Sequence, residues 1–231
     1  MRNSILVTLA AVSLTTSLFA KKDDAEKRLD AAGTTLSEIM NTPDKGLPQE
    51  LLDKAQCVVI VPGLKKAAFV IGGKYGKGFT MCRKGGKGWS APAAVIVEGG
   101  SFGFQIGGSE TDVVMLVMNE SGAKRLLSSK FTLGGDASIA AGPVGRTASA
   151  DTDASMRAEI LSYSRSRGVF AGISLSGATL REDSEGNMEL YGSKMSNKDI
   201  LMGSTKAPAG AAKLESLLNR TSMSKESTKL P

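Results

Sequence analysis

Residues 23–40 predict an amphipathic helix, because apolar residues recur at spacings of three and four. The apolar positions of this segment are Ala25, Leu29, Ala32, Leu36, Ile39 and Met40. Asp23 or Asp24 can cap the start of the helix, and Pro43 with Gly46 ends it. A shorter helix is expected at residues 48–55, with Pro48 in its first turn.

From residue 57 the pattern changes to short β-rich runs that glycine-rich turns separate. The expected strands are Cys57–Val61, Ala67–Gly73, Lys77–Arg83, Ala93–Glu98, Ser101–Gly107 and Asp112–Met118. The glycine pairs at 72–73 and 99–100 are expected at turns. A strand spacing of about ten residues is typical of an antiparallel meander that curls toward a barrel or a sandwich.

The second half of the chain continues the mixture of helices and strands. Helices are expected at residues 120–127, 197–201 and 209–219, and strands at residues 131–141, 159–166, 169–180 and 188–191. Glu182, Asp183 and Glu185 precede Gly186-Asn187, a pattern that favours an acidic hairpin turn. The sequence therefore predicts one α+β domain over residues 21–220, with a curved, largely antiparallel, glycine-rich sheet and flanking helices. Residues 221–231 are expected to form a disordered tail.

Residues 1–20 have the layout of a secretory signal peptide. A short start with Arg2 leads into a mostly apolar stretch, and charged residues begin at Lys21. An uncleaved anchor helix is the alternative, which the Ser and Thr residues of the stretch and its shortness disfavour. We therefore expect the protein to be exported with loss of about twenty residues.

Composition excludes several classes of enzyme. The 231 residues contain no histidine and two cysteines, which removes Ser-His-Asp catalysis, Cys-His catalysis and imidazole metal sites. Nucleotide-binding glycine motifs and the G-x-S-x-G motif are absent. Cys57 and Cys82 lie in two expected strands, where they could form a disulfide in an oxidising compartment or remain two separate thiols. No catalytic residue, metal or cofactor is expected.

Positive charge is concentrated between Lys54 and Ser90, a segment without an acidic residue. Its basic residues are Lys54, Lys65, Lys66, Lys74, Lys77, Arg83, Lys84 and Lys87. Such a segment could contact phosphates of nucleic acid or anionic lipid headgroups, or it could be a solvated strand face. Export disfavours nucleic acid, so no nucleic-acid partner is expected.

A series of short motifs resembles the SYLF-domain family, also described as the Ysc84-type lipid-binding or actin-binding domain. The matching segments, in chain order, are Gly73–Gly78, Trp89–Pro92, Gly100–Gly107, Phe131–Gly134, Ala141–Arg146, Tyr163–Gly168 and Tyr191–Gly192. They extend over about residues 35–205. The resemblance implies a binding module rather than an enzyme, and an exported bacterial member located in the periplasm or cell envelope, peripheral to a membrane.

The resemblance also implies a lipid-binding surface, because eukaryotic relatives bind phosphoinositide-containing membranes, partly through an N-terminal amphipathic helix. The export signal makes actin and phosphoinositides poor candidates here, so an anionic phospholipid membrane is the expected partner. The candidate lipid-binding residues are Lys27, Arg28, Lys65, Lys66, Lys74, Lys77, Arg83 and Lys84. Leu29, Leu36 and Ile39 are either membrane-inserting residues or core residues. The alternative function is a cell-envelope structural or interaction protein that binds an acidic protein or polysaccharide.

Overall fold

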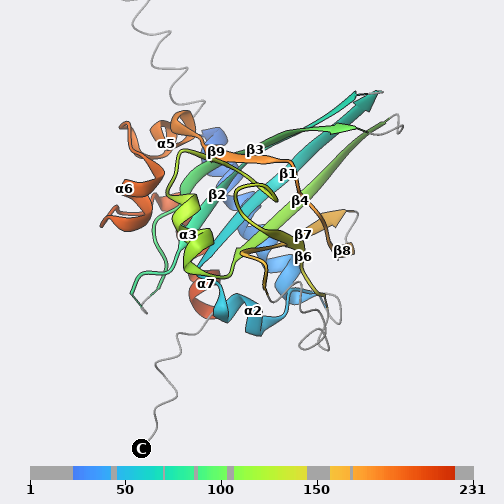
Figure 1. Cartoon of the computed structure of the whole chain (residues 1–231). Helices are drawn as coiled ribbons and strands as arrows, with labels where there is room; N and C mark the ends of the chain where they lie inside the picture. The colour runs from blue at the N-terminus through green and yellow to red at the C-terminus, as the bar shows by residue number, and fades with distance from the viewer. Residues whose placement is uncertain are drawn as a thin grey trace, which may run out of the picture.

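The computed structural model describes residues 23–42, 46–69, 71–85, 88–102, 107–144, 157–166 and 169–221. The expected signal peptide, and all of the expected C-terminal tail except residue 221, lie outside these residues. The described strands form one nine-stranded sheet in the order β5-β9-β3-β2-β1-β4-β7-β6, with β8 paired to β7 (Figure 1). The sheet curls and helices pack around it, which confirms the expected α+β class.

Four long strands, in the order β3-β2-β1-β4, form the middle of the sheet. The strands are β1 (Cys57–Phe69), β2 (Ile71–Cys82), β3 (Ala93–Phe102), β4 (Gly107–Val117), β5 (Lys130–Thr132), β6 (Ile139–Ala141), β7 (Ile160–Ser166), β8 (Val169–Gly172) and β9 (Thr179–Glu182). Among these strands, β6 and β7 pair in parallel, and the other pairs are antiparallel.

Helices precede and follow the long strands. Residues 23–41 form the N-terminal helix. The remaining helices are α2 (Gln49–Lys54), α3 (Glu120–Leu126), α5 (Ser184–Tyr191), α6 (Asn197–Met202), the 3-10 turn η1 (Ala209–Ala211) and α7 (Ala212–Thr221). Side chains cap several of them: Asn119 accepts a hydrogen bond from the Gly122 N–H at the start of α3, and Ser196 accepts one from the Asp199 N–H in α6.

Two hydrophobic cores lie on the two faces of the sheet, because successive strand residues point to opposite faces. On one face Val58, Ile60 and Phe79 pack with the N-terminal helix, α2 and α7, and we call this the helix-side core. On the other face Val59 and Met115 pack with residues of α3, β5 and α6. Figure 1 shows α3 in front of the sheet and the N-terminal helix behind it.

The first hairpin differs from the sequence prediction. The expected break between residues 61 and 67 is a bulge inside β1, where Gly63 takes a φ of 61° and the pairing register shifts. The glycine pairs at 72–73 and 99–100, expected at turns, lie within β2 and β3. The structure therefore has one long hairpin where the sequence predicted three short strands.

The expected hairpin turn at residues 182–187 and the expected strand at residues 188–191 are both wrong. The Asp183 side chain accepts a hydrogen bond from the Gly186 N–H, 3.0 Å away, and thereby caps α5. The helix ends at Gly192, which takes the left-handed conformation at φ 68°. The acidic cluster is thus the start of a helix that packs against β3, where Gly186 lies close to Ala94.

The far ends of β1, β2, β3 and β4 project beyond the helices, toward the upper right of Figure 1. The packed part of the hairpin extends as far as Leu64 and Gly76, because Leu64 is fully buried and a Cβ on Gly76 would lie 2.9 Å from the Leu64 Cδ1. Beyond that point Lys65, Ala67 and Tyr75 are exposed. We call residues 65–69, 71–75, 98–102 and 107–110 the projecting end.

Candidate cationic binding site

The structure divides the basic segment into two groups at opposite ends of the first hairpin. Cys57 pairs with Cys82 at the base of the hairpin, and Phe69 pairs with Ile71 at its tip. Lys65, Lys66 and Lys74 therefore lie in the projecting end. Lys77, Arg83 and Lys84 lie in the body of the molecule and interact with other parts of the chain.

Lys66 and Lys74 are cross-strand partners in β1 and β2. Directly opposed residues of an antiparallel pair have Cβ atoms roughly 5 Å apart, so the two ammonium groups share one region of space. Both lysines are half-buried, and neither has an acidic partner within ion-pair distance among the described residues. Burial, and secondarily the charge of Lys66, lowers the pKa of the Lys74 ammonium.

The Lys74 side chain lies over Gly99, its partner in β3. A Cβ on Gly99 would be 3.4 Å from the Lys74 Cε and 3.1 Å from the Cα of Ala178, which precedes β9. The absence of a side chain at position 99 therefore makes room for both neighbours. Two close cations without a counter-charge are stabilised by a bound anion, and phosphate oxygens suit this arrangement.

The acidic residues of the projecting end are Glu98 and Glu110. Arg181 of β9 holds Glu98 through two hydrogen bonds of 2.8 and 3.2 Å, and this interaction keeps the pKa of the Glu98 carboxyl below its usual value. Glu110 is the cross-strand partner of Lys65. With Glu98 compensated by Arg181, three lysines face one remaining carboxylate, and the projecting end carries net positive charge.

Lys77 connects β2 with α5 instead of contributing to this surface. Its Nζ lies 2.9 Å from Oδ2 of Asp183, whose side chain is 4% exposed. Because a buried carboxylate needs a cationic partner, Lys77 compensates the charge of the residue that caps α5. Lys77 and Arg28 also lower the pKa of the Glu189 carboxyl, although burial outweighs them and raises it overall. Lys77 therefore has a structural role.

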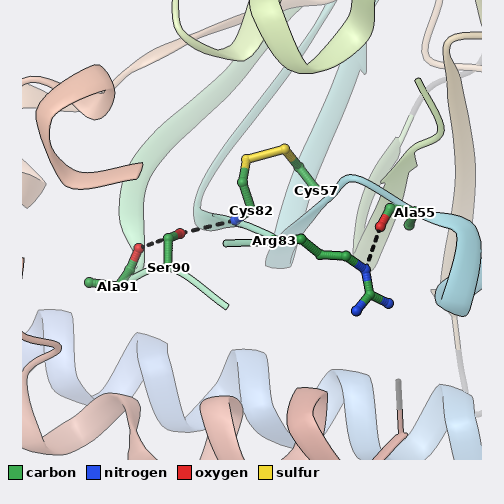
Figure 2. The surroundings of a disulfide bond; sticks show 6 residues. All are labelled: Ala55, Cys57, Cys82, Arg83, Ser90 and Ala91. Atoms are coloured by element: carbon green, nitrogen blue, oxygen red, sulfur yellow. Dashed lines mark hydrogen bonds between the residues drawn. A yellow bond between two sulfur atoms is a disulfide. The ribbon is translucent and has the colours of Figure 1, made fainter. Parts of the chain in front are cut away.

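Arg83 and Lys84 bind backbone carbonyl groups. The Arg83 Nε donates to the Ala55 oxygen at 2.9 Å (Figure 2), and its Nη2 donates to Leu52 and Asp53 at the end of α2. The guanidinium also lies 4.6 Å from the centre of the Trp89 ring, a cation–π contact. Lys84 Nζ donates to the Gly203 oxygen after α6. These two cations hold helix ends to the sheet.

Cys57 and Cys82 form a disulfide between the paired strands β1 and β2, with a sulfur–sulfur distance of 2.05 Å. Figure 2 shows the bond beside Ser90, whose hydroxyl accepts from the Cys82 N–H and donates to the Ala91 oxygen, both at 3.0 Å. Of the two alternatives that the sequence left open, the structure contains the paired cysteines. The disulfide closes the base of the hairpin, opposite to the projecting end.

The N-terminal helix buries its apolar face in the protein. Leu29, Leu36 and Ile39 are fully buried in the helix-side core, so the structure contains the core alternative for these residues. In this arrangement the three side chains are not accessible to a membrane. Lys27 is exposed and pairs with Asp23 at 2.6 Å, and Arg28 is half-buried.

Two kinds of site are absent from the described residues. No group of three or more His, Cys, Asp or Glu side chains there could hold a metal ion. No helix in the described ranges has the length and apolar character needed to cross a membrane.

Sequence reasoning missed three residues that define the site. Glu98 and Arg181 are 83 positions apart, and no local motif indicates that they pair. Tyr75 is 47% exposed beside Lys65, and its position between basic residues in the sequence does not by itself assign it a role. The register that opposes Lys66 to Lys74 also pairs Phe69 with Ile71, whereas the sequence predicted that the chain turns at the glycine pair 72–73.

Comparison with known proteins supplies the family. Residues 98–221 match the model of the Ysc84 family, described as "Las17-binding protein actin regulator". This span excludes Lys65, Lys66 and Lys74. The description is one of binding and regulation rather than of catalysis.

Similar proteins share most of the chain. An SH3 domain-containing protein of Schizosaccharomyces pombe, PJ696.02, is 39% identical over 75% of this chain and 41% of its own length. SH3 domain-containing YSC84-like protein 1 of Xenopus laevis is 35% identical over 80% of this chain and 56% of its own length. Protein YSC84 of Saccharomyces cerevisiae is 35% identical over 76% of this chain and 38% of its own length. The chain thus spans about half the length of these relatives or less, and it belongs to the Ysc84 (SYLF) family.

Proposed function

We propose that this protein is a non-enzymatic lipid-binding module that associates peripherally with anionic phospholipid membranes through Lys65, Lys66 and Lys74. The observation that carries the proposal is the Lys66–Lys74 pair, which has no acidic partner among the described residues. Lys77, Arg83 and Lys84 are left out of the contact surface because each binds elsewhere in the chain.

Electrostatic attraction alone gives weak binding. A lysine near an anionic membrane surface contributes about 1 kcal/mol, so three lysines contribute about 3 kcal/mol. That total corresponds to a dissociation constant above roughly 1 mM, and salt weakens it further. Stable attachment therefore requires an apolar contribution as well. The N-terminal helix could supply it only by leaving the core, because Leu29, Leu36 and Ile39 are buried.

An acidic protein or polysaccharide is the alternative partner for the same lysines. The family description as a Las17-binding protein and actin regulator favours a protein partner. The two functions differ in one measurable respect, because only a lipid-binding module binds vesicles in the absence of other macromolecules.

Vesicle co-sedimentation tests the proposal. We expect the purified protein to sediment with vesicles of phosphatidylcholine and phosphatidylglycerol, and not with phosphatidylcholine alone. The charge reversal Lys66→Glu/Lys74→Glu should abolish sedimentation at an unchanged melting temperature, since both changes lie beyond the packed core. The matched control is Lys194→Glu/Lys198→Glu, two exposed lysines near α6, which should sediment like the parent. Failure of the parent to bind anionic vesicles would reject the lipid function and leave the alternative partner.

We also propose that the protein is exported and works in the periplasm or cell envelope. The Cys57–Cys82 disulfide supports this location, because disulfides persist in oxidising compartments. The mass of the protein recovered from its native source tests the proposal, which requires an N-terminus near Lys21. Intact Met1 in a cytosolic fraction would contradict it.

A further inference from the structure

Lys66 and Lys74 lie on the face of the sheet that is opposite to the N-terminal helix. Leu64 is two positions before Lys66 in β1, and it belongs to the core on that opposite face. Gly76, which packs against Leu64, is two positions after Lys74 in β2. Because residues two positions apart in a strand share a face, both lysines project from the side of Leu64. Lys65 projects from the other side, that of the N-terminal helix.

The register places four residues side by side in the row of this lysine pair. Across β3, β2, β1 and β4 they are Gly99, Lys74, Lys66 and Ser109. Two adjacent cations thus occupy the middle of the row, with a glycine beside Lys74 and a hydroxyl group beside Lys66. Ser109 is exposed, so its hydroxyl is accessible to a ligand that the two ammonium groups bind.

The rows next to the lysine pair on the same face contain no acidic residue. They consist of Leu64, Gly76, Val97 and Thr111 toward the core, and of Ala68, Gly72, Ser101 and Gly107 toward the tip. Glu98 and Glu110 belong to the intervening row and project from the opposite face. Within the described part of these four strands, the two ammonium groups therefore have no counter-charge on their own side of the sheet.

The Lys74 side chain is confined before any ligand binds. A Cβ on Gly99 would lie 3.4 Å from the Lys74 Cε and 3.2 Å from the Gly177 oxygen. The end of the Lys74 stem and the turn that precedes β9 thus border the same small space over Gly99. Because Lys74 has lost part of its freedom in the folded protein, less entropy is lost when its ammonium group binds an anion.

The charge of the lysine pair suits one class of phosphate. A phosphodiester headgroup has a single negative charge, whereas a phosphomonoester carries about −1.5 to −2 at pH 7. A phosphomonoester also presents three terminal oxygens, which accept charge-assisted hydrogen bonds from two ammonium groups and a hydroxyl group together. A phosphodiester has only two such oxygens, and its binding leaves one of the two half-buried cations without compensation.

We propose that Lys66, Lys74 and Ser109 bind one phosphomonoester, so that the protein prefers lipids with a terminal phosphate to lipids whose phosphate is a diester. This inference rests on the proposed lipid function and specifies the headgroup class for the same site. It also orients the projecting end, whose Lys66–Lys74 face lies against the membrane. Lys65, on the other face, then contributes only general electrostatic attraction.

Vesicle affinity at matched surface charge tests the inference. The vesicles contain phosphatidylcholine with either phosphatidic acid, a phosphomonoester, or phosphatidylglycerol, a phosphodiester, in proportions that give equal zeta potentials. Equal potentials make the general attraction the same, so the ratio of the two affinities measures recognition of the headgroup. We expect the parent to bind the phosphatidic acid vesicles about tenfold more tightly, which corresponds to about 1.4 kcal/mol.

Neutral substitutions separate the pair from the neighbouring lysine. Lys66→Met removes one cation of the pair and should reduce the affinity ratio to about twofold or less. The matched control is Lys65→Met, which removes the same charge from the adjacent position on the opposite face. It should lower the affinity for both kinds of vesicle by a similar factor and leave the ratio unchanged. Both variants should keep the melting temperature of the parent, because the two lysines lie beyond the packed core.

Inorganic phosphate is the probe for a soluble source of the same chemistry. At constant ionic strength, about 1 mM inorganic phosphate should leave the binding of phosphatidic acid vesicles intact, because contacts with two lysines alone give a dissociation constant above roughly 1 mM. Displacement of the protein from the vesicles at that concentration would assign the pair to a soluble phosphate and overturn the lipid assignment.

The outcomes separate this inference from the proposed function. Equal affinity of the parent for the two kinds of vesicle would overturn headgroup selection and leave lipid binding intact. An unchanged ratio in Lys66→Met, or a ratio lost in Lys65→Met, would overturn the assignment to the Lys66–Lys74 face in the same way. Failure of the parent to bind either kind of vesicle would overturn both proposals.

Discussion

At the residue scale, the environment of Lys74 predicts opposite effects of pH on binding and on stability. Burial and Lys66 lower the pKa of the folded-state ammonium below 10.5, whereas the unfolded chain keeps the ordinary value. As pH rises toward 10.5, Lys74 loses its proton first in the folded protein, and anionic vesicles should dissociate. Over the same interval the unfolded state binds more protons, so Lys74 contributes a free energy of unfolding that increases with pH.

Two measurements test this prediction. They are the vesicle affinity and the free energy of urea unfolding, each determined as a function of pH for the parent and for Lys66→Met. Removing Lys66 removes the repulsion that is the second cause of the lowered pKa, so dissociation should shift to higher pH in the variant. Identical pH profiles for the two proteins would contradict a direct interaction between the lysines. The other alkaline titrations of the chain are common to both proteins, and the comparison therefore isolates the pair.

At the scale of elements, the glycines of β2 predict contrasting substitutions. A Cβ on Gly78 would lie 2.1 Å from the Ile60 oxygen, whereas a Cβ on Gly73 would meet nothing within 4 Å. We expect Gly78→Ala to destabilise the protein by several kcal/mol through displacement of β1. Gly73→Ala should be neutral or stabilising by up to about 1 kcal/mol, because alanine reduces the freedom of the unfolded chain. Urea unfolding distinguishes the two variants, and equal losses of stability would refute the close packing of β2 against β1 at Gly78.

The same glycines explain how far the sequence predicted the elements. The period of apolar residues placed the N-terminal helix and most strands correctly, because burial of one face determines those patterns. The hairpin was predicted with wrong turns, since glycine marks a turn and a close packing contact alike. Gly76 and Gly78 serve packing, and no local signal separates that use from a turn at Gly72-Gly73. Asp183 was assigned to a turn for the same reason, because acidic residues favour turns and helix starts equally.

The candidate site was only partly predictable at this scale. The sequence shows the excess of lysine. Which of these cations can contact a binding partner, and which stabilise the fold, depends on residues that are distant in the chain. Lys77 meets Asp183, and Arg83 meets the end of α2, through contacts that form only when the sheet is assembled. The same lysine-rich pattern therefore contains both Lys74, which has no acidic partner among the described residues, and cations that the fold itself uses.

At the scale of the whole molecule, stability and binding depend on opposite ends of the first hairpin, the disulfide at its base and the projecting end at its tip. The Cys57–Cys82 bond spans 25 positions at the base of the hairpin, and Lys66 and Lys74 lie toward its tip. Closing a loop of that length stabilises a fold by about 3 kcal/mol, because it lowers the conformational entropy of the unfolded chain. The helix-side core and α2 also contact the sheet at the base of the hairpin. The base therefore unfolds together with the body of the protein.

We therefore expect Cys57→Ser/Cys82→Ser to lose about 3 kcal/mol of unfolding free energy while its vesicle affinity stays within about twofold of the parent, well under the tenfold that corresponds to 1.4 kcal/mol. Lys66→Glu/Lys74→Glu should show the reverse, with lost affinity and retained stability. Treatment of the parent with dithiothreitol reproduces the first result without substitution, and Lys194→Glu/Lys198→Glu serves as the reference for both assays. If the double serine variant were still folded at the assay temperature and yet lost vesicle binding, the tip would depend on the base of the hairpin. The projecting end would then be a flexible extension of the core that the disulfide holds in place, rather than an independently ordered binding element.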